Sequence, residues 1–362
     1  MTRPAVTSPM TDFLAVINRF RAEFDPEELA AVLSRYDIGA IKSVEKQLKG
    51  SRRSPKMIVE ADRGRFLLKR RARGRDHPVK VAFSHAVQLH LLSEGFPLPQ
   101  LVPVVGEDDT MVIIDDRLYE MFEFVGGGVY GRTLSETRDG GRVLGMFHRL
   151  LKDYHTDWGP SRLGYHNADI VRTNLQNIPE TVGKDDSVAG REGELFATVS
   201  SLYESYSAAC ERTEEVGFKQ WRDQLVHSDW HPGNMLFADG RVRAVIDYDS
   251  LHMLPAVTDL ANGLLQFSIV GGAGEPQHWP AELDRERFVE FFRGYNEEFT
   301  IPPDQLAVVT SLMVEALVAE AVAPIAATGT FGRIEGFRFL QMIGRKVRWI
   351  ERNGESAMKV AQ

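Results

Sequence analysis

Strand-like alternation of apolar and polar residues dominates the chain between residues 41 and 125. Short apolar segments are separated by turn residues such as Asp62-Arg63-Gly64, and helical spacing occurs in one segment, residues 79–93. Five strands are predicted, over residues 41–48, 56–61, 65–71, 111–115 and 118–124. This part of the chain should therefore form a small antiparallel sheet with one helix.

Helical spacing dominates after residue 140. Helices are predicted over residues 143–154, 192–213, 285–299 and 303–325, and an irregular segment over residues 160–190. One hairpin interrupts this pattern, because segments 235–238 and 241–247 flank Asp239-Gly240, a pair that favours a two-residue turn.

The pattern predicts an α+β protein with two lobes. Helical spacing over residues 11–36 indicates an N-terminal helical extension, residues 1–40. The β-rich N-terminal lobe follows over residues 41–125, and Gly126-Gly127-Gly128 is expected to be a hinge. Residues 126–362 form a large, mostly helical C-terminal lobe.

Composition and charge exclude several classes of protein. A hydrophobic share of 43% is too high for a disordered chain, and the net charge of −8 argues against nucleic-acid and membrane-surface partners. The single cysteine, Cys210, excludes an intrachain disulfide and is compatible with a reducing cytoplasm. The most apolar late segment, residues 311–327, is interrupted by Glu315 and Glu320, so we expect a soluble, cytoplasmic protein. The oligomeric state stays open.

The densest set of candidate functional residues surrounds the Asp239-Gly240 hairpin. A two-residue turn would place Asn234 opposite Val245, so that Asn234 and Asp247 project to one face as diagonal neighbours, roughly 7–8 Å apart. An amide oxygen and a carboxylate at that separation suit Mg²⁺. Asp229 lies on the loop that enters the hairpin.

His227-x-Asp229-x-x-x-x-Asn234, followed by Ile246-Asp247, resembles the motif of the aminoglycoside phosphotransferase and choline-kinase-like superfamily. Residues 83–97 look most like its spore-coat kinase-like branch. The resemblance implies a protein-kinase-like two-lobe fold. It also implies transfer of the γ-phosphate of ATP, or alternatively GTP, to a hydroxyl of a small-molecule acceptor.

The same resemblance implies roles for the polar residues. Asp229 would be the catalytic base, His227 would support the catalytic loop, and Asp259 of the Asp-Leu-Ala segment would anchor that loop. Asn234 and Asp247 would hold Mg²⁺, and Asp249 would assist a second metal ion.

A lysine from the sheet should bind the inner phosphates, and Lys69 is the candidate. Gly50 and Ser51 would lie over the phosphates. The place of the helix glutamate that usually pairs with this lysine falls at Ser84, where no acid is available. Gln88, His85 or another group would then hold Lys69.

Two other functions stay open. The missing helix glutamate favours a pseudokinase that binds nucleotide without turnover. The segment His227-x-Asp229-x-His231 instead resembles the ligand set of a metal-dependent hydrolase. Glu315 and Glu320 would suit a cationic acceptor, although surface or buried-pair roles are favoured. The identity of the acceptor is not predicted.

Overall fold

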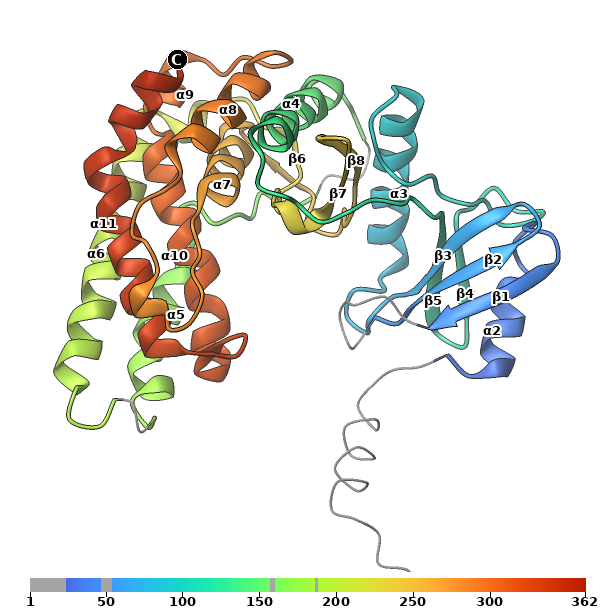
Figure 1. The fold of residues 1–362 in the computed structure, drawn as a ribbon, viewed down its shortest axis with the longest axis horizontal. Coiled ribbons are helices and arrows are strands. Elements are labelled where there is room, and N and C mark those ends of the chain that lie inside the picture. The colour runs from blue at the N-terminus through green and yellow to red at the C-terminus, as the bar shows by residue number, and fades with distance from the viewer. Residues whose placement is uncertain (1–23, 47–53, 157–159, 186–187) are drawn as a thin grey trace, which may run out of the picture. The chain divides into compact units, whose positions relative to one another are not determined.

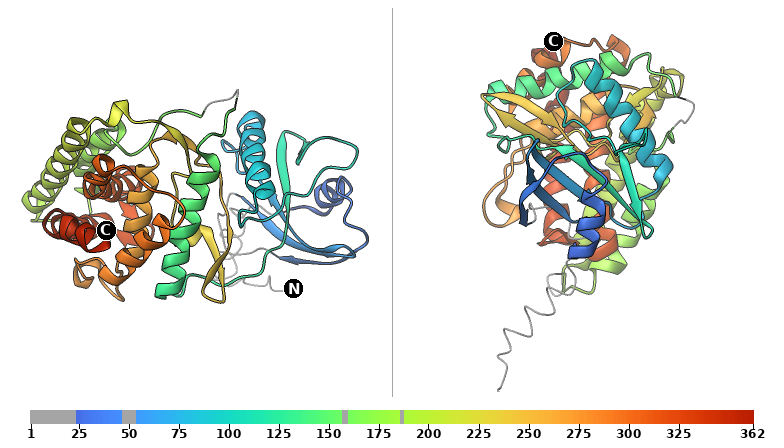
Figure 2. Two further views of the ribbon diagram at one scale, coloured as in Figure 1. Left: turned by 90° about the horizontal axis from the view of Figure 1, so that it is seen from above. Right: turned by 90° about the vertical axis from the view of Figure 1, so that its right-hand side faces the viewer.

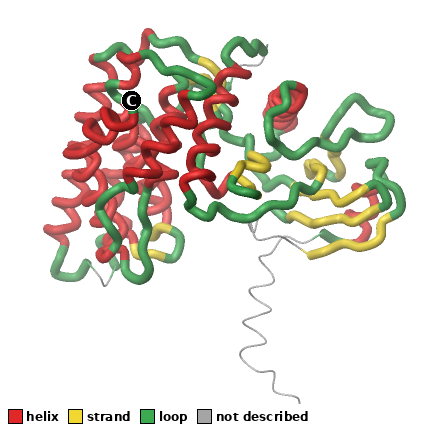
Figure 3. Tube along the Cα trace, turned by 45° about the horizontal axis from the view of Figure 1, so that its top comes forward, coloured by secondary structure: helices red, strands yellow, loops and turns green. Residues whose placement is uncertain are grey.

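The computed structural model describes residues 24–46, 54–156, 160–185 and 188–362. The chain divides into two compact units, residues 1–126 and 127–362, so that the boundary falls within the glycine segment 126–128 (Figure 1). The first unit is built around strands, and helices make up most of the second (Figure 3). The α+β class is thereby confirmed.

The first unit contains one five-stranded antiparallel sheet with the order β1-β2-β3-β5-β4. Its elements are α2 (Pro26–Leu33), β1 (Ile41–Lys46), β2 (Lys56–Ala61), β3 (Gly64–Arg70), α3 (Pro78–Ser93), β4 (Met111–Ile114) and β5 (Arg117–Glu123). The five predicted strands and the predicted helix are present. Strand β5 lies between β3 and β4, so it pairs with a strand that is distant in the sequence.

Side-chain alternation gives the sheet two different faces. Phe66 and Leu68 of β3 and Met121 of β5 are buried in one core with Val32 and Leu33 of α2. Helix α2 thus packs against the sheet. The described part of the expected N-terminal extension, residues 24–40, therefore belongs to the first unit. Its start is stabilised by a capping box between Asp25 and Glu28. Residues 1–23 lie outside the described part.

In its described residues, the second unit is mostly helical, with three two-stranded sheets. Its helices are α4 (Leu134–Leu151), α5 (Asp169–Val182), α6 (Glu192–Glu215), α7 (Val257–Ser268), α8 (Arg285–Asn296), α9 (Pro303–Leu306), α10 (Val309–Thr328) and α11 (Gly336–Ala361). Its strands are β6 (Gln224–Val226), β7 (Met235–Ala238), β8 (Arg241–Val245), β9 (His252–Leu254), β10 (Thr330–Phe331) and β11 (Ile334–Glu335).

Helix α10 forms the centre of the second unit, and α6 and α11 lie beside it in both views (Figures 1 and 2). It is the one helix of the described residues that is long and apolar enough to span a membrane. However, 72% of its most apolar window is buried within the protein. That burial is typical of a core helix, as expected from Glu315 and Glu320 in its sequence.

Two helix predictions for the second unit are wrong. Residues 160–190 contain helix α5, whose buried residues Val171, Leu175, Ile178 and Val182 follow one helical face. Helix α4 begins at Leu134 rather than at residue 143, through a segment whose glycines lower its helical propensity. Packing against α8 explains these glycines: a Cβ on Gly141 would lie 2.0 Å from the carbonyl oxygen of Phe291.

Candidate functional site

The loop after β6 is held by one buried carboxylate. Asp259, in the first turn of α7, accepts hydrogen bonds from the backbone N–H groups of His227 (2.6 Å) and Ser228 (2.8 Å). Ser228 has a left-handed backbone with φ of 61°, a conformation that costs a serine free energy and that these bonds stabilise. The loop that carries Asp229 therefore has a fixed path.

The imidazole of His227 is fully buried among aromatic rings. The centroids of Phe147, Trp230 and Tyr248 lie 5.9, 5.4 and 5.3 Å from its own. Burial lowers the pKa of His227, against the opposing effect of the carboxylates of Asp259, Asp229 and Asp247. A neutral, ring-packed imidazole suits support of the loop better than proton transfer.

Asp229 and Asn234 contact each other at the start of the hairpin. The amide nitrogen of Asn234 donates to the carboxylate of Asp229 (2.8 Å) and to its backbone carbonyl (3.1 Å). The short 3₁₀ turn Pro232–Asn234 brings the two residues together. Because its NH₂ group faces Asp229, the amide oxygen of Asn234 is directed elsewhere and can accept a cation.

The predicted hairpin register is wrong by one residue. Asp239-Gly240 forms the two-residue turn, with both residues at positive φ, and Ala238 pairs with Arg241 as expected. A bulge between Leu236 and Phe237 then shifts the pairing, so Met235 rather than Asn234 lies opposite Val245.

Asp247 follows β8 in a left-handed conformation, with φ of 68°. Asp247 and Asp249 are exposed on either side of the buried Tyr248. None of the described residues donates a hydrogen bond to the carboxylate of Asp247. Strained backbone at an exposed, unpartnered acid is a frequent feature of functional sites.

The available donors in this segment suit a hard divalent cation. The amide oxygen of Asn234 and the carboxylates of Asp247 and Asp249 are oxygen ligands of the kind that Mg²⁺ prefers. A few such ligands suffice, because Mg²⁺ takes its remaining oxygens from water and phosphate.

The first unit places Lys69 beside an acid that the sequence did not indicate. Lys69 and Glu120 are direct cross-strand partners on β3 and β5, and Nζ lies 2.9 Å from Oε1. The other oxygen of Glu120 accepts from Arg71 (2.9 and 3.1 Å) and from Nε2 of His85 (2.9 Å). Burial raises the pKa of Glu120, but Lys69, His85 and Arg71 outweigh it and hold that pKa well below its usual range.

The expected substitute on helix α3 makes a different contact. The side chain of Gln88 donates to the carbonyl and hydroxyl oxygens of Ser84. Lys69 instead pairs with Glu120. Helix α3 still carries no acid, but its absence no longer leaves Lys69 without an acidic partner. Gly50 and Ser51 lie outside the described residues.

A cavity of about 280 Å³ adjoins the loop within the second unit. Ser228, Asp259, Asn262 and Glu320 contribute to its wall. Ser228 Oγ and Asn262 Oδ1 are buried there without a hydrogen-bond partner among the described residues. The surrounding protein raises the pKa of Glu320 to about 7, by limiting its hydration and through Asp229, although the side chain remains partly exposed.

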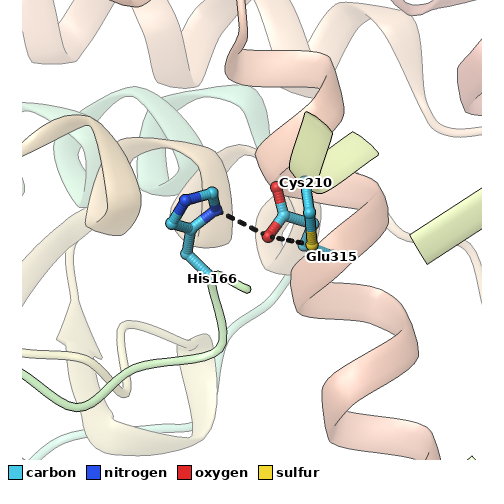
Figure 4. A group of neighbouring side chains, drawn as sticks. All are labelled: His166, Cys210 and Glu315. Carbon is cyan, nitrogen blue, oxygen red and sulfur yellow. Dashed lines mark hydrogen bonds and ion pairs between the residues drawn. The ribbon is translucent and has the colours of Figure 1, made fainter. Parts of the chain in front are cut away.

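A second polar cluster contains Glu315, which is fully buried on α10 (Figure 4). Its carboxylate accepts from His166 (2.8 Å), Cys210 (3.2 Å) and Thr213 (3.2 Å). The ligand atoms of His166, Cys210 and Glu315 lie within 4.8 Å of one another, as in a metal site. Burial, followed by Glu315, raises the pKa of Cys210 to about 12, so the thiol stays protonated and the cluster is a buried polar network.

The hydrolase alternative loses its geometric basis. Within the described ranges, His227, Asp229 and His231 do not form a group of three metal ligands, and the His227 ring is enclosed by aromatic side chains. His231 is used locally, because its Nδ1 accepts from the backbone N–H of Gly233.

Sequence comparison identifies a family for most of the chain. The model of the phosphotransferase enzyme family, APH, matches residues 44–304. No curated protein matches the sequence significantly.

Solved structures of low sequence identity share the fold. An aminoglycoside phosphotransferase from Alicyclobacillus acidocaldarius has a TM-score of 0.70 at 15% identity, over 95% of this chain and 98% of that one. A microcompartment-associated aminopropanol kinase has a TM-score of 0.64 at 18% identity, over 92% and 98%. The amicoumacin kinase hAmiN, solved with AMP-PNP and Ca²⁺, has a TM-score of 0.60 at 15% identity, over 94% and 96%. The predicted kinase-like fold is confirmed.

Proposed function

The chain belongs to the phosphotransferase enzyme family, and from this premise we propose that it transfers the γ-phosphate of ATP to a hydroxyl of a small molecule. The observation that supports this most directly is the loop at 227–234, in which Asp259 fixes the backbone and Asn234 bonds Asp229. Phosphoryl transfer depends on positioning and charge neutralisation, and this arrangement supports the positioning.

Each polar residue has a defined role in the proposed reaction, and Asn234 has two. Asp229 accepts the proton of the attacking hydroxyl, and Asn234 holds its carboxylate in place. Lys69 binds the inner phosphates. Asn234 and Asp247 hold Mg²⁺, assisted by Asp249, and the bound ion neutralises charge on the phosphates. His227 supports the loop through ring packing.

The cavity beside the loop is the proposed acceptor site. Glu320, Asn262 Oδ1 and Ser228 Oγ offer it a carboxylate and two unpartnered polar atoms. Such groups suit an alcohol that also carries an amine, because an ammonium donates hydrogen bonds and pairs with the carboxylate. One of the structural relatives is an aminopropanol kinase, and aminopropanol is an alcohol of this kind.

The proposed setting follows from composition. We propose a soluble, cytoplasmic enzyme whose partners are nucleotide and acceptor, without nucleic acid or membrane. The net charge of −8 supports this, and GTP is the alternative phosphate donor.

Thermal-shift titration with ATP and with GTP, each with and without Mg²⁺, tests the proposal. Nucleotide at 100 times its dissociation constant should add about 2.7 kcal/mol to the free energy of unfolding. Asp247→Asn should abolish the Mg²⁺ dependence. Asp239→Asn is the matched control, because Asp239 lies in the turn of the same hairpin and asparagine tolerates its positive φ. Absence of stabilisation by either nucleotide would contradict the proposal.

A further inference from the structure

The acid that faces Lys69 is carried by a strand of the sheet. Lys69 and Glu120 are paired in register on β3 and β5, so their side chains project from the same face at neighbouring positions. The Lys69 side chain is 15% exposed and that of Glu120 is 0% exposed. The carboxylate is thus enclosed, while the lysine side chain keeps some contact with solvent.

Helix α3 contributes a donor to this cluster. His85 Nε2 contacts the Glu120 carboxylate and Nδ1 contacts the hydroxyl of Thr110 at 2.7 Å. Because Glu120 is ionised, the Nε2 atom must carry the proton. Together with Arg71, His85 holds one oxygen of Glu120, and the other oxygen faces Lys69.

We propose that Glu120 is the positioning residue for Lys69, and that it performs from a strand the task that a helix glutamate performs in kinase-like folds. This inference rests on the proposed function, because the position of Lys69 matters only if Lys69 binds nucleotide. A glutamate on a helix loses its lysine when the helix moves. Glu120 and Lys69 lie on adjacent hydrogen-bonded strands, so their pairing persists as long as the sheet is folded.

A double-mutant cycle on the full-length chain tests this inference. The dissociation constant of ATP with Mg²⁺ is measured for the wild type, Glu120→Gln, Lys69→Met and the double variant. Glu120→Gln should raise that constant by about tenfold. It should have little further effect in the Lys69→Met background, because Glu120 acts through Lys69.

Glu28→Gln is the matched control. Glu28 is also a largely buried carboxylate of the first unit, and it pairs with Arg70 of the same strand on the opposite face of the sheet. Glu28 does not contact Lys69, so loss of its charge should destabilise the unit without moving Lys69. The nucleotide affinity of Glu28→Gln should therefore equal that of the wild type.

The possible outcomes separate the two proposals. If the wild type binds no nucleotide, the proposed function fails and the role of Glu120 fails with it. If the wild type binds nucleotide but Glu120→Gln raises the dissociation constant no more than Glu28→Gln does, the assignment of Glu120 is wrong and the proposed function stands. The same holds if the effects of Glu120→Gln and Lys69→Met on the dissociation constant multiply in the double variant. If Glu120→Gln does not fold, Glu120→Asp is used in the same cycle. It keeps the negative charge in the cluster but shortens the side chain that carries the carboxylate to Lys69, and the same criteria apply.

Discussion

A buried carboxylate holds a candidate functional residue or segment in each unit. Glu120 of the first unit contacts the side chains of Lys69, Arg71 and His85. Asp259 of the second unit contacts the backbone N–H groups of His227 and Ser228. Glu120 therefore determines where a charge lies, whereas Asp259 determines the path of a backbone segment.

This difference predicts different consequences of substitution. A change at the Glu120 cluster should alter nucleotide affinity, because it moves the proposed phosphate-binding cation, Lys69. A change at the loop that Asp259 holds should alter turnover, because it moves the proposed base. Measurements that separate binding from turnover can therefore support or contradict the distinction between the two carboxylates.

Asp229→Asn should have the largest effect. It keeps the shape of the side chain but removes the proton acceptor, so turnover should fall by ~10²–10⁴. Nucleotide affinity should be nearly unchanged, in contrast to Glu120→Gln. Steady-state kinetics with an acceptor, or the slow hydrolysis of ATP, together with calorimetric titration, would test this. Loss of nucleotide binding in Asp229→Asn would contradict the separation of roles.

Asp259→Asn should destabilise the protein by about 3 kcal/mol. The neutral amide presents an NH₂ group to one of two backbone donors, so one N–H group of the loop loses its acceptor. Denaturant unfolding measures the loss, and turnover should fall with it. Asp25→Asn is the control, because Asp25 caps α2 and asparagine is an equally good cap. Equal stability of the two variants would show that Asp259 does not hold the loop.

Acid should remove the stabilisation that Glu120 provides. The pKa of Glu120 is held well below its usual value of 4.5, so the folded state binds the proton less tightly than the unfolded chain. The stabilisation is therefore complete above pH 4.5 and is lost as the pH falls through the folded-state pKa. Denaturant unfolding at a series of pH values should show that acid lowers the free energy of unfolding less in Glu120→Gln than in the wild type. An equal decrease of this free energy in the two proteins would show that the Glu120 cluster does not cause it.

Glu320 should have the smallest effect, on acceptor binding alone. Its pKa is raised to about 7, so the carboxylate becomes ionised as the pH rises through that value. The KM for an amine-bearing alcohol should therefore fall as the pH rises. Glu320→Gln should raise this KM by about fivefold above neutral pH and remove its pH dependence, since Glu320 is partly exposed. A neutral polyol serves as the control, because the wild type and Glu320→Gln should bind it equally well. An unchanged pH profile of the KM for the amine-bearing alcohol in Glu320→Gln would contradict the prediction.

Local patterns in the sequence predict much of this protein. Alternation predicted the five strands, and Asp239-Gly240 predicted the hairpin turn, because period and turn preference depend on neighbouring residues. Alternation also places Phe66 and Leu68 on the face of β3 that is opposite to the face carrying Lys69. The motif from His227 to Asn234 indicated the loop, and the resemblance implied that Asp259 anchors it.

Tertiary contacts decided the remaining features. Glycines 141 and 145 disfavour a helix locally, yet they permit α4 to approach the backbone of α8. The bulge at Leu236 shifts the register of Asn234, and no turn residue marks it. Glu120 reaches Lys69 only because β5 pairs with β3, and the sequence between them leaves that partner open. Local propensity acts between neighbours along the chain, whereas these contacts join residues that only the folded packing brings together.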